Sequence, residues 1–190
     1  MRNSFAVVLL FAAIVVAPAV RAQDESPSAA SRMELYGGYD YVRFNINSNV
    51  NGQPPSQIFN GNGGGGELIY NVNNWLGVLG DVSGVWASSS TKAGAAIPYL
   101  FGPRASLHRG RITPFVQVLF GGVLTSSGIE TIGWQSHFAM TAGGGLDVRV
   151  SKRWAIRPVQ AEYFLTKIPD GLNNRQDNFH LSAGIVFRFG

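Results

Sequence analysis

The chain has 190 residues, with 15 Lys and Arg against 11 Asp and Glu, and it contains no cysteine. The absence of cysteine excludes disulfides, thiolate metal sites and a cysteine nucleophile. The net positive charge is small and the basic residues are scattered along the sequence, which argues against a nucleic-acid-binding protein.

Residues 1–22 have the pattern of a secretory signal peptide. Arg2 gives a positive start, residues 5–16 form an uncharged apolar run, and small residues end the segment at Ala22. The apolar run is shorter than the roughly 20 residues of a transmembrane helix, so we expect cleavage after Ala22 rather than a membrane anchor. Residues 23–32 show no periodicity and are expected to form a periplasmic tether, which leaves residues 33–190 as one domain.

Alternation of apolar and polar residues with a period of two predicts eight β-strands after the tether. It is clearest at the C-terminus, where Phe179, Leu181 and Ile185 alternate with His180 and Ser182. This terminal run has about the length of a tilted transmembrane strand, roughly 9–11 residues. The predicted strands are residues 33–44, 64–70, 75–87, 97–107, 112–124, 137–150, 154–165 and 178–190.

The connections between these strands alternate between long and short. Long connections are expected at residues 45–63, 88–95, 125–136 and 167–177, and tight turns at 71–74, 108–111 and 151–153. Bacterial outer-membrane barrels have long extracellular loops and short periplasmic turns. Aromatic residues are expected in two girdles, one near the turns and one near the loops, as a membrane-spanning barrel requires: Tyr70, Trp75, Trp154 and Phe189, and Trp86, Tyr99, Phe138 and Phe179.

A soluble lipocalin-like barrel of eight strands would also alternate, but it would turn its apolar face inward and its charges outward. In this sequence the strand faces rich in Leu, Val and Phe carry almost no charge, and lysine is nearly absent from the strands. We therefore expect the apolar faces to contact lipid. The predicted fold class is all-β, an eight-stranded antiparallel up-and-down transmembrane β-barrel over residues 33–190.

The chain resembles the eight-stranded outer-membrane barrels of the OmpA/OmpX type over the whole sequence after the signal. The likeness rests on four short motifs: Leu35-Tyr36-Gly37-Gly38-Tyr39, Gly102-Pro103-Arg104, Gly143-Gly144-Gly145-Leu146-Asp147 and Phe187-Arg188-Phe189. The single Gly190 after the terminal aromatic departs slightly from the usual ending. The resemblance implies a cell outer membrane location, contact with membrane lipid and lipopolysaccharide, and insertion by the barrel assembly machinery.

Projecting the polar strand faces inward gathers a set of charged residues in the lumen. Counted up their strands from the turns, Glu67, Arg104, Asp147 and Arg157 are expected to share one level, with Asp81 a little higher. Acidic and basic side chains at one level are predicted to pair, because an unpaired charge away from bulk water is costly. The favoured interpretation is a structural plug, and the alternative is a gate or ion path. The cluster contains Glu67, Asp81, Arg104, Asp147, Arg149, Arg157 and Arg188. Because Arg157 is out of phase with Gln160, a β-bulge is expected between them.

His180 and Ser182 lie two residues apart on one strand, as do the catalytic residues of lipid A deacylases with eight-stranded barrels. Here the pair is expected to face inward, away from lipid, and no acidic partner for His180 is evident nearby in the sequence. His108 and His137 are too far apart in register to share a metal. We therefore expect no catalytic, cofactor-binding or metal-binding residue, and no enzyme activity.

The expected function is structural or surface-interacting (adhesin-like), with a monomeric barrel that holds long loops outside the cell. A small low-conductance pore is the alternative, if the lumen cluster can open. A lipid A-modifying hydrolase that uses Ser182 is the third possibility.

Overall fold

A computed structural model describes residues 31–46, 57–88, 93–127, 135–168 and 175–189. The predicted signal peptide and most of the predicted tether lie outside the described residues. The strands are β1 (Met33–Ile46), β2 (Gln57–Asn71), β3 (Leu76–Ser88), β4 (Ala93–Ser106), β5 (Ile112–Ser127), β6 (Gln135–Arg149), β7 (Trp154–Thr166) and β8 (Gln176–Phe189). No helix in the described part of the chain is long and apolar enough to span a membrane.

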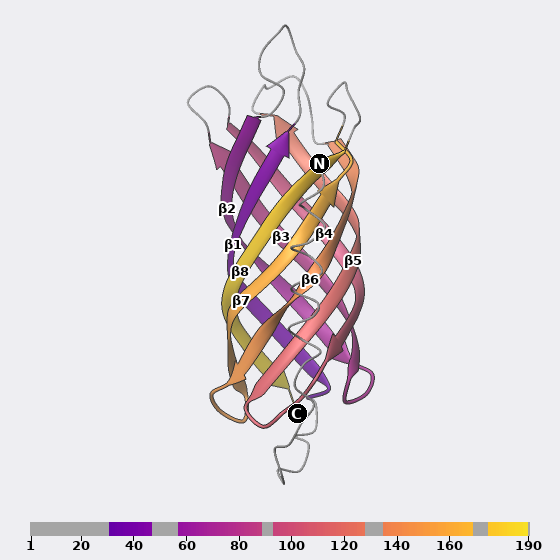
Figure 1. The fold of residues 1–190 in the computed structure, drawn as a ribbon, viewed down its shortest axis with the longest axis vertical. Helices are drawn as coiled ribbons and strands as arrows, with labels where there is room; N and C mark the ends of the chain where they lie inside the picture. The colour runs from indigo at the N-terminus through magenta and orange to yellow at the C-terminus, as the bar shows by residue number, and fades with distance from the viewer. Residues whose placement is uncertain (1–30, 47–56, 89–92, 128–134, 169–174, 190) are drawn as a thin grey trace, which may run out of the picture.

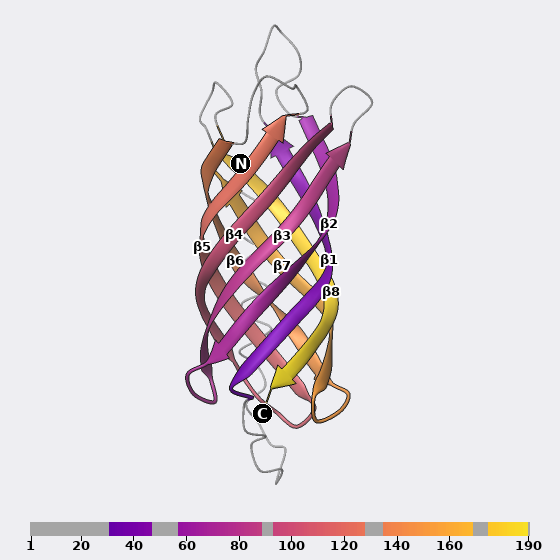
Figure 2. The same ribbon diagram turned by 180° about the vertical axis from the view of Figure 1, so that it is seen from behind.

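The eight strands form one closed antiparallel barrel in which each strand pairs with its neighbours in sequence (Figures 1 and 2). The ring closes between β1 and β8, where Leu35 lies opposite Phe187 and Tyr39 lies opposite Ala183. The predicted fold class is therefore confirmed. We call the end with residues 72–75, 107–111 and 150–153 the turn end, and the opposite end of the barrel the loop end.

The wall of the barrel has an apolar outer face and a largely polar inner face. Along β8, Phe179, Ile185 and Phe189 are exposed on the outside, whereas His180 and Ser182 are buried inside. The eight aromatic residues of the two predicted girdles are all exposed on the outer face. The outer wall thus presents a continuous hydrophobic belt, as a membrane-spanning barrel must.

Several strands extend further toward the loop end than predicted. β2 begins at Gln57 rather than at residue 64, and β4 begins at Ala93 rather than at residue 97. The β3–β4 connection, residues 89–92, is consequently no longer than the turn of residues 72–75, so this connection was wrongly predicted to be long. The sequence did not predict these extensions, because polar residues such as Asn60 and Asn62 stand where the alternating pattern would require apolar ones. They are nevertheless paired with β1, opposite Arg43 and Tyr41.

The predicted bulge in β7 is confirmed. The register with β8 shifts between Arg157 and Gln160, and the register with β6 shifts between Leu146 and Val148. Pro158 lies in the shifted segment, where its missing N–H removes no regular ladder bond. The bulge allows both Arg157 and Gln160 to point into the lumen although an odd number of positions separates them.

Candidate functional site: the closed lumen

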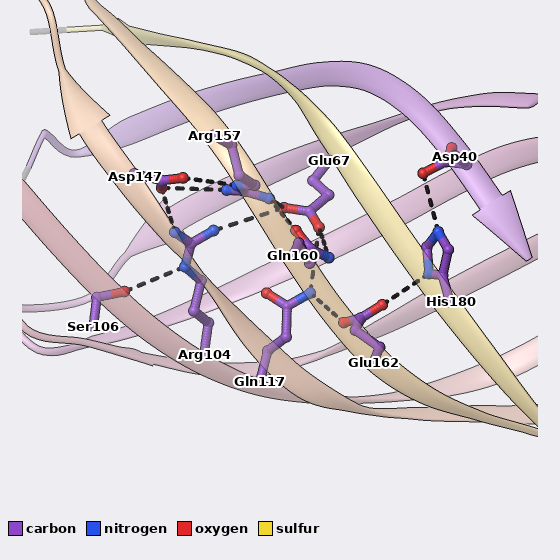
Figure 3. Close-up of polar contacts among 10 residues, drawn as sticks. All are labelled: Asp40, Glu67, Arg104, Ser106, Gln117, Asp147, Arg157, Gln160, Glu162 and His180. Atoms are coloured by element: carbon purple, nitrogen blue, oxygen red, sulfur yellow. Dashed lines mark hydrogen bonds and ion pairs between the residues drawn. The ribbon is translucent and has the colours of Figure 1, made fainter. Parts of the chain in front are cut away.

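Two arginines and two carboxylates meet in the part of the lumen nearer the turn end and form the central network, defined here as Glu67, Arg104, Asp147 and Arg157 (Figure 3). Arg157 lies 2.6 Å from Glu67 and 2.7 Å from Asp147. Arg104 lies 2.7 Å from Asp147 and 3.6 Å from Glu67. The four residues come from β2, β4, β6 and β7, and their formal charges cancel.

Neutral polar side chains extend the central network in both directions. Arg104 Nε donates to Ser106 Oγ at 3.2 Å, toward the turn end. Gln160 Nε2 donates to Glu67 Oε1 at 2.9 Å. Gln117 Nε2 donates to Glu67 Oε1 at 3.3 Å and to Glu162 Oε1 at 2.9 Å. Gln117 therefore links the central network to polar groups nearer the loop end.

Aromatic rings pack against the two guanidinium groups. Arg104 Cζ lies 3.6 Å from the ring centroid of Phe115. Arg157 Cζ lies 4.2 Å from the ring centroid of Tyr36 and 4.5 Å from that of Phe115. Such cation–π contacts fill the space beside the charges with apolar surface and add about 0.5–2 kcal/mol each.

A second group, the loop-side cluster, contains Asp40, Asp81, Glu162 and His180. His180 Nε2 lies 3.0 Å from Asp40, and its Nδ1 lies 3.0 Å from Glu162 (Figure 3). Contact of both ring nitrogens with carboxylates matches a doubly protonated ring, which donates from both positions. Asp81 lines a small cavity with Glu162 and His180, and the cavity volume of about 10 Å³ is room for roughly one water molecule.

The remaining lumen charges lie nearer the turn end. Arg188 forms an ion pair with Glu34 at 3.3 Å, and both side chains are buried. Arg149 lies at the turn end beside Arg111 and Lys152. Of the seven predicted lumen residues, the structure thus brings four into the central network. It places Asp81 in the loop-side cluster, Arg188 in a separate pair and Arg149 at the rim.

Several polar residues of the lumen were left out of the predicted charge cluster, although His180 among them was predicted to face inward: Glu34, Asp40, Gln117, Gln160, Glu162 and His180. Strand parity contained the signal for two of them, because Glu34 and Asp40 alternate with the outward-facing Leu35 and Tyr39. No acidic partner for His180 was evident nearby in the sequence, and the structure provides two partners that are distant in sequence. Asp40 and Glu162 come from β1 and β7, which flank β8 in the closed ring.

The polar network fills the lumen from the turn end to about half the height of the barrel. It runs through hydrogen bonds and ion pairs from Ser106 to Asp40 and includes side chains of every strand except β3. The side chains of Glu67, Asp147 and Arg157 are 0% exposed and that of Arg104 is 2% exposed. A water-filled channel at this level would leave these side chains accessible to water. The arrangement therefore closes the lumen and ties the strands together.

The lumen geometry does not match a serine hydrolase. Both nitrogens of His180 contact carboxylates, so neither is left to take a proton from Ser182. His108 lies in the turn of residues 107–111, where partial burial lowers the pKa of its imidazole and Nδ1 lies 2.9 Å from the Asn74 carbonyl oxygen. Among the described residues, no group of three or more His, Asp or Glu side chains is arranged to hold a metal ion.

Comparison with solved structures finds proteins of a similar fold. Similar solved structures include the attachment invasion locus protein Ail of Yersinia pestis, with 18% identity and a TM-score of 0.54, covering 84% of this chain and 99% of Ail. Neisserial surface protein A has 14% identity and a TM-score of 0.62, with 82% and 97% coverage. The N-terminal β-barrel domain of Pseudomonas aeruginosa OprF has 12% identity and a TM-score of 0.50, with 85% and 100% coverage.

At these identities the solved structures establish a shared fold and nothing finer. A search of curated proteins finds no significant match. The family profile described as "Outer membrane protein beta-barrel domain" matches residues 6–187, which is nearly the whole chain. The chain belongs to this family of outer membrane β-barrels.

Proposed function

We propose that this protein is a structural, surface-interacting (adhesin-like) barrel of the cell outer membrane whose loop end faces the outside of the cell. One observation carries the proposal. The central network closes the lumen with fully buried, paired charges, which leaves the two ends of the barrel as the surfaces that can meet other molecules. The apolar outer wall anchors the barrel in lipid, and the network makes it rigid.

The closed lumen weighs against the alternative of a pore. An eight-stranded barrel is just wide enough for its interior to be filled by side chains. Here the filling groups are neutralised in pairs, so opening a path would expose or separate charges. Planar-bilayer recordings test this directly: we expect no single-channel steps from the folded protein under conditions in which a larger porin gives steps. Reproducible steps from the wild-type barrel would favour the pore.

The orientation of the barrel is tested by labelling single cysteines, because the chain has none of its own. Gly128→Cys places a thiol in the connection of residues 128–134, and Ser151→Cys places one in the turn of residues 150–153. A membrane-impermeant maleimide should label Gly128→Cys on intact cells and label Ser151→Cys only after the outer membrane is permeabilised. The reverse pattern would contradict the proposed orientation.

Sulfated glycans are the first ligands to test at the loop end. Ail has been crystallised in complex with the heparin analogue sucrose octasulfate. In this chain the exposed cations Arg43 and Lys167 lie near the loop end. If they contribute to glycan binding, Arg43→Gln combined with Lys167→Gln should weaken binding of labelled heparin to intact cells that carry the barrel, whereas Lys152→Gln at the turn end, which faces the cell interior in the proposed orientation, should not. Equal binding to cells with all three proteins would remove this ligand class.

The proposal also includes the processing and surroundings of the barrel. We propose that residues 1–22 are removed as a signal peptide, that the barrel is monomeric, and that it contacts membrane lipid and lipopolysaccharide after insertion by the barrel assembly machinery. Mass spectrometry of the protein from the outer membrane should give the mass of a chain that begins at Gln23.

A further inference from the structure

The turn end of the barrel differs from the lumen in charge. Acidic side chains of the described residues lie almost entirely in the lumen, and the one nearest the turn end, Glu34, is buried and paired with Arg188. In the described residues, the surface of the turn end carries positive side chains and no exposed acidic one. These positive side chains belong to Arg32, Arg109, Arg111, Arg149, Lys152 and Arg153. The turn end is therefore a strongly cationic surface.

Part of this surface is hollowed. Arg111, Arg149, Val150, Ser151 and Lys152 line a depression of about 360 Å³ between the turn before β5 and the turn after β6. The backbone holds the two turns together, because the Arg149 N–H donates to the Arg111 carbonyl oxygen at 2.7 Å. The turn after β6 is itself fixed, since the Val150 and Ser151 N–H groups donate to the Trp154 carbonyl oxygen. The cations are thus presented by a defined, hydrogen-bonded rim.

Exposed apolar side chains lie directly beside these cations. Val150 lines the depression and is 64% exposed, and Ile112, which follows Arg111, is 49% exposed. Ile112 pairs with Val148 in the outer wall, and Trp154 of the turn-end aromatic girdle follows shortly after Lys152. One residue of a strand spans about 3.3 Å, so the positive charges lie within a few ångströms of the hydrophobic belt. This is the depth at which lipid headgroups meet a membrane protein.

We propose that this depression binds the phosphate headgroup of an anionic phospholipid from the leaflet at the turn end. Arg111, Arg149 and Lys152 contact the phosphate, and the acyl chains lie along the outer wall over Ile112 and Val148. A guanidinium beside an ammonium suits a phosphate that several donors share. The adjoining apolar surface favours a lipid over an acidic cell-wall polymer or an acidic protein, because only a lipid has chains to cover Val150 and Ile112.

Native mass spectrometry of the refolded barrel in detergent tests the proposal. The protein is titrated with phosphatidylglycerol and, separately, with phosphatidylcholine, and the dissociation constant of the first bound lipid is measured. Phosphatidylglycerol should bind more tightly, and added salt should weaken it. Arg111→Gln or Lys152→Gln should each weaken its binding about fivefold, the change expected for one cation near an anionic lipid surface. Arg43→Gln and Lys167→Gln at the loop end serve as matched controls and should leave its binding unchanged.

Four results would overturn the inference. The first is equal affinity for the two lipids. The second is equal weakening by turn-end and loop-end variants, which would indicate non-specific attraction. The third is displacement of phosphatidylglycerol by equimolar inorganic phosphate, which would make this a site for free phosphate. The fourth is displacement by soluble peptidoglycan fragments, which would make the cell wall the partner. A heat-dependent gel shift of every variant establishes that each one is folded.

Discussion

Replacing Arg157 with methionine should destabilise the barrel more than any exposed substitution. Arg157 is 0% exposed and contacts both carboxylates of the central network, at 2.6 Å and 2.7 Å. Methionine retains much of the length of the side chain but removes the charge and the donors. The central network then has one cation for two carboxylates, and Arg104 alone remains to neutralise them. Removing one partner of a buried ion pair costs about 3–5 kcal/mol, and we expect a loss of this size in the free energy of unfolding.

The double variant Arg157→Met and Glu67→Met separates charge compensation from simple packing. It leaves Arg104 and Asp147 as a neutral pair at 2.7 Å. The remaining cost is that of amide groups of Gln117 and Gln160 that lose an acceptor, about 1–3 kcal/mol for a buried donor left unsatisfied. The double variant should therefore be more stable than Arg157→Met alone.

Both variants can be measured by urea unfolding of the chain refolded into lipid vesicles, followed by tryptophan fluorescence and by gel mobility. Stability is compared from the transition midpoints after confirming equal slopes. Arg175→Met is the control, because Arg175 pairs with Asp177 at 3.0 Å on the exposed surface and such pairs contribute little. Glu67→Met alone completes the set. If the double variant loses as much stability as Arg157→Met and Glu67→Met added together, the charges are energetically independent and the reasoning fails.

Three further predictions use the same unfolding assay. Gly102→Ala should lower the free energy of unfolding by about 1–3 kcal/mol, because the new Cβ would clash with the Val118 carbonyl oxygen. Gly80→Ala places its Cβ in open space and should leave the free energy of unfolding unchanged. Equal effects of the two variants would contradict the packing of β4 on β5. His180→Leu should lower the free energy of unfolding by about 3–5 kcal/mol, because it leaves the two carboxylate partners of His180 without a cation. An unchanged stability would show that the loop-side cluster does not stabilise the barrel. Trp154→Leu should lower the free energy of unfolding by about 0.5–1.5 kcal/mol more than Trp86→Leu does, because the Trp154 ring makes an edge contact with Phe187 at a centroid distance of 4.8 Å. Identical losses would show that this contact contributes nothing.

Strand number, order and the orientation of each face could be predicted from the sequence because lipid imposes a strict rule on the outer wall. Every outward position within the hydrocarbon must be apolar, so the alternation along β8 from Phe179 to Phe189 identifies both the strand and its faces. The bulge in β7 was predictable for the same reason. Arg157 and Gln160 both need to point inward, and an uninterrupted strand would have placed one of them in lipid.

The ends of the strands toward the loop end could not be predicted in this way. Beyond the hydrocarbon, the outer face meets water and no longer has to be apolar. Tyr39 donates a hydrogen bond to Asn62 at 2.5 Å, and Tyr41 donates one to Asn60 at 2.9 Å, both between outward-facing side chains of β1 and β2. Ladder pairing continues there without an apolar pattern, so the sequence resembles a loop.

The pairing of lumen charges was only partly accessible, because it depends on contacts across the barrel. Heights counted along single strands placed Glu67, Arg104, Asp147 and Arg157 at one level. They could not show that Asp40 contacts His180, because β1 and β8 become neighbours only when the ring closes. Glu162 did not need the closed ring, since it lies opposite His180 on the neighbouring strand β7 and could have been found by pairing β7 with β8.

The charged lumen also explains how the chain selects its register in lipid. Because side chains alternate with a period of two, a slip of one residue would turn every side chain of a strand to the opposite face. Such a slip in β4 would move Arg104 from the lumen to the hydrocarbon, where a charged side chain is strongly disfavoured. Its partners Asp147 and Glu67 would be left unpaired in the lumen. Buried charges that add little net stability to a correct barrel therefore impose a large penalty on each misregistered one, which favours a single rigid barrel over a set of alternatives.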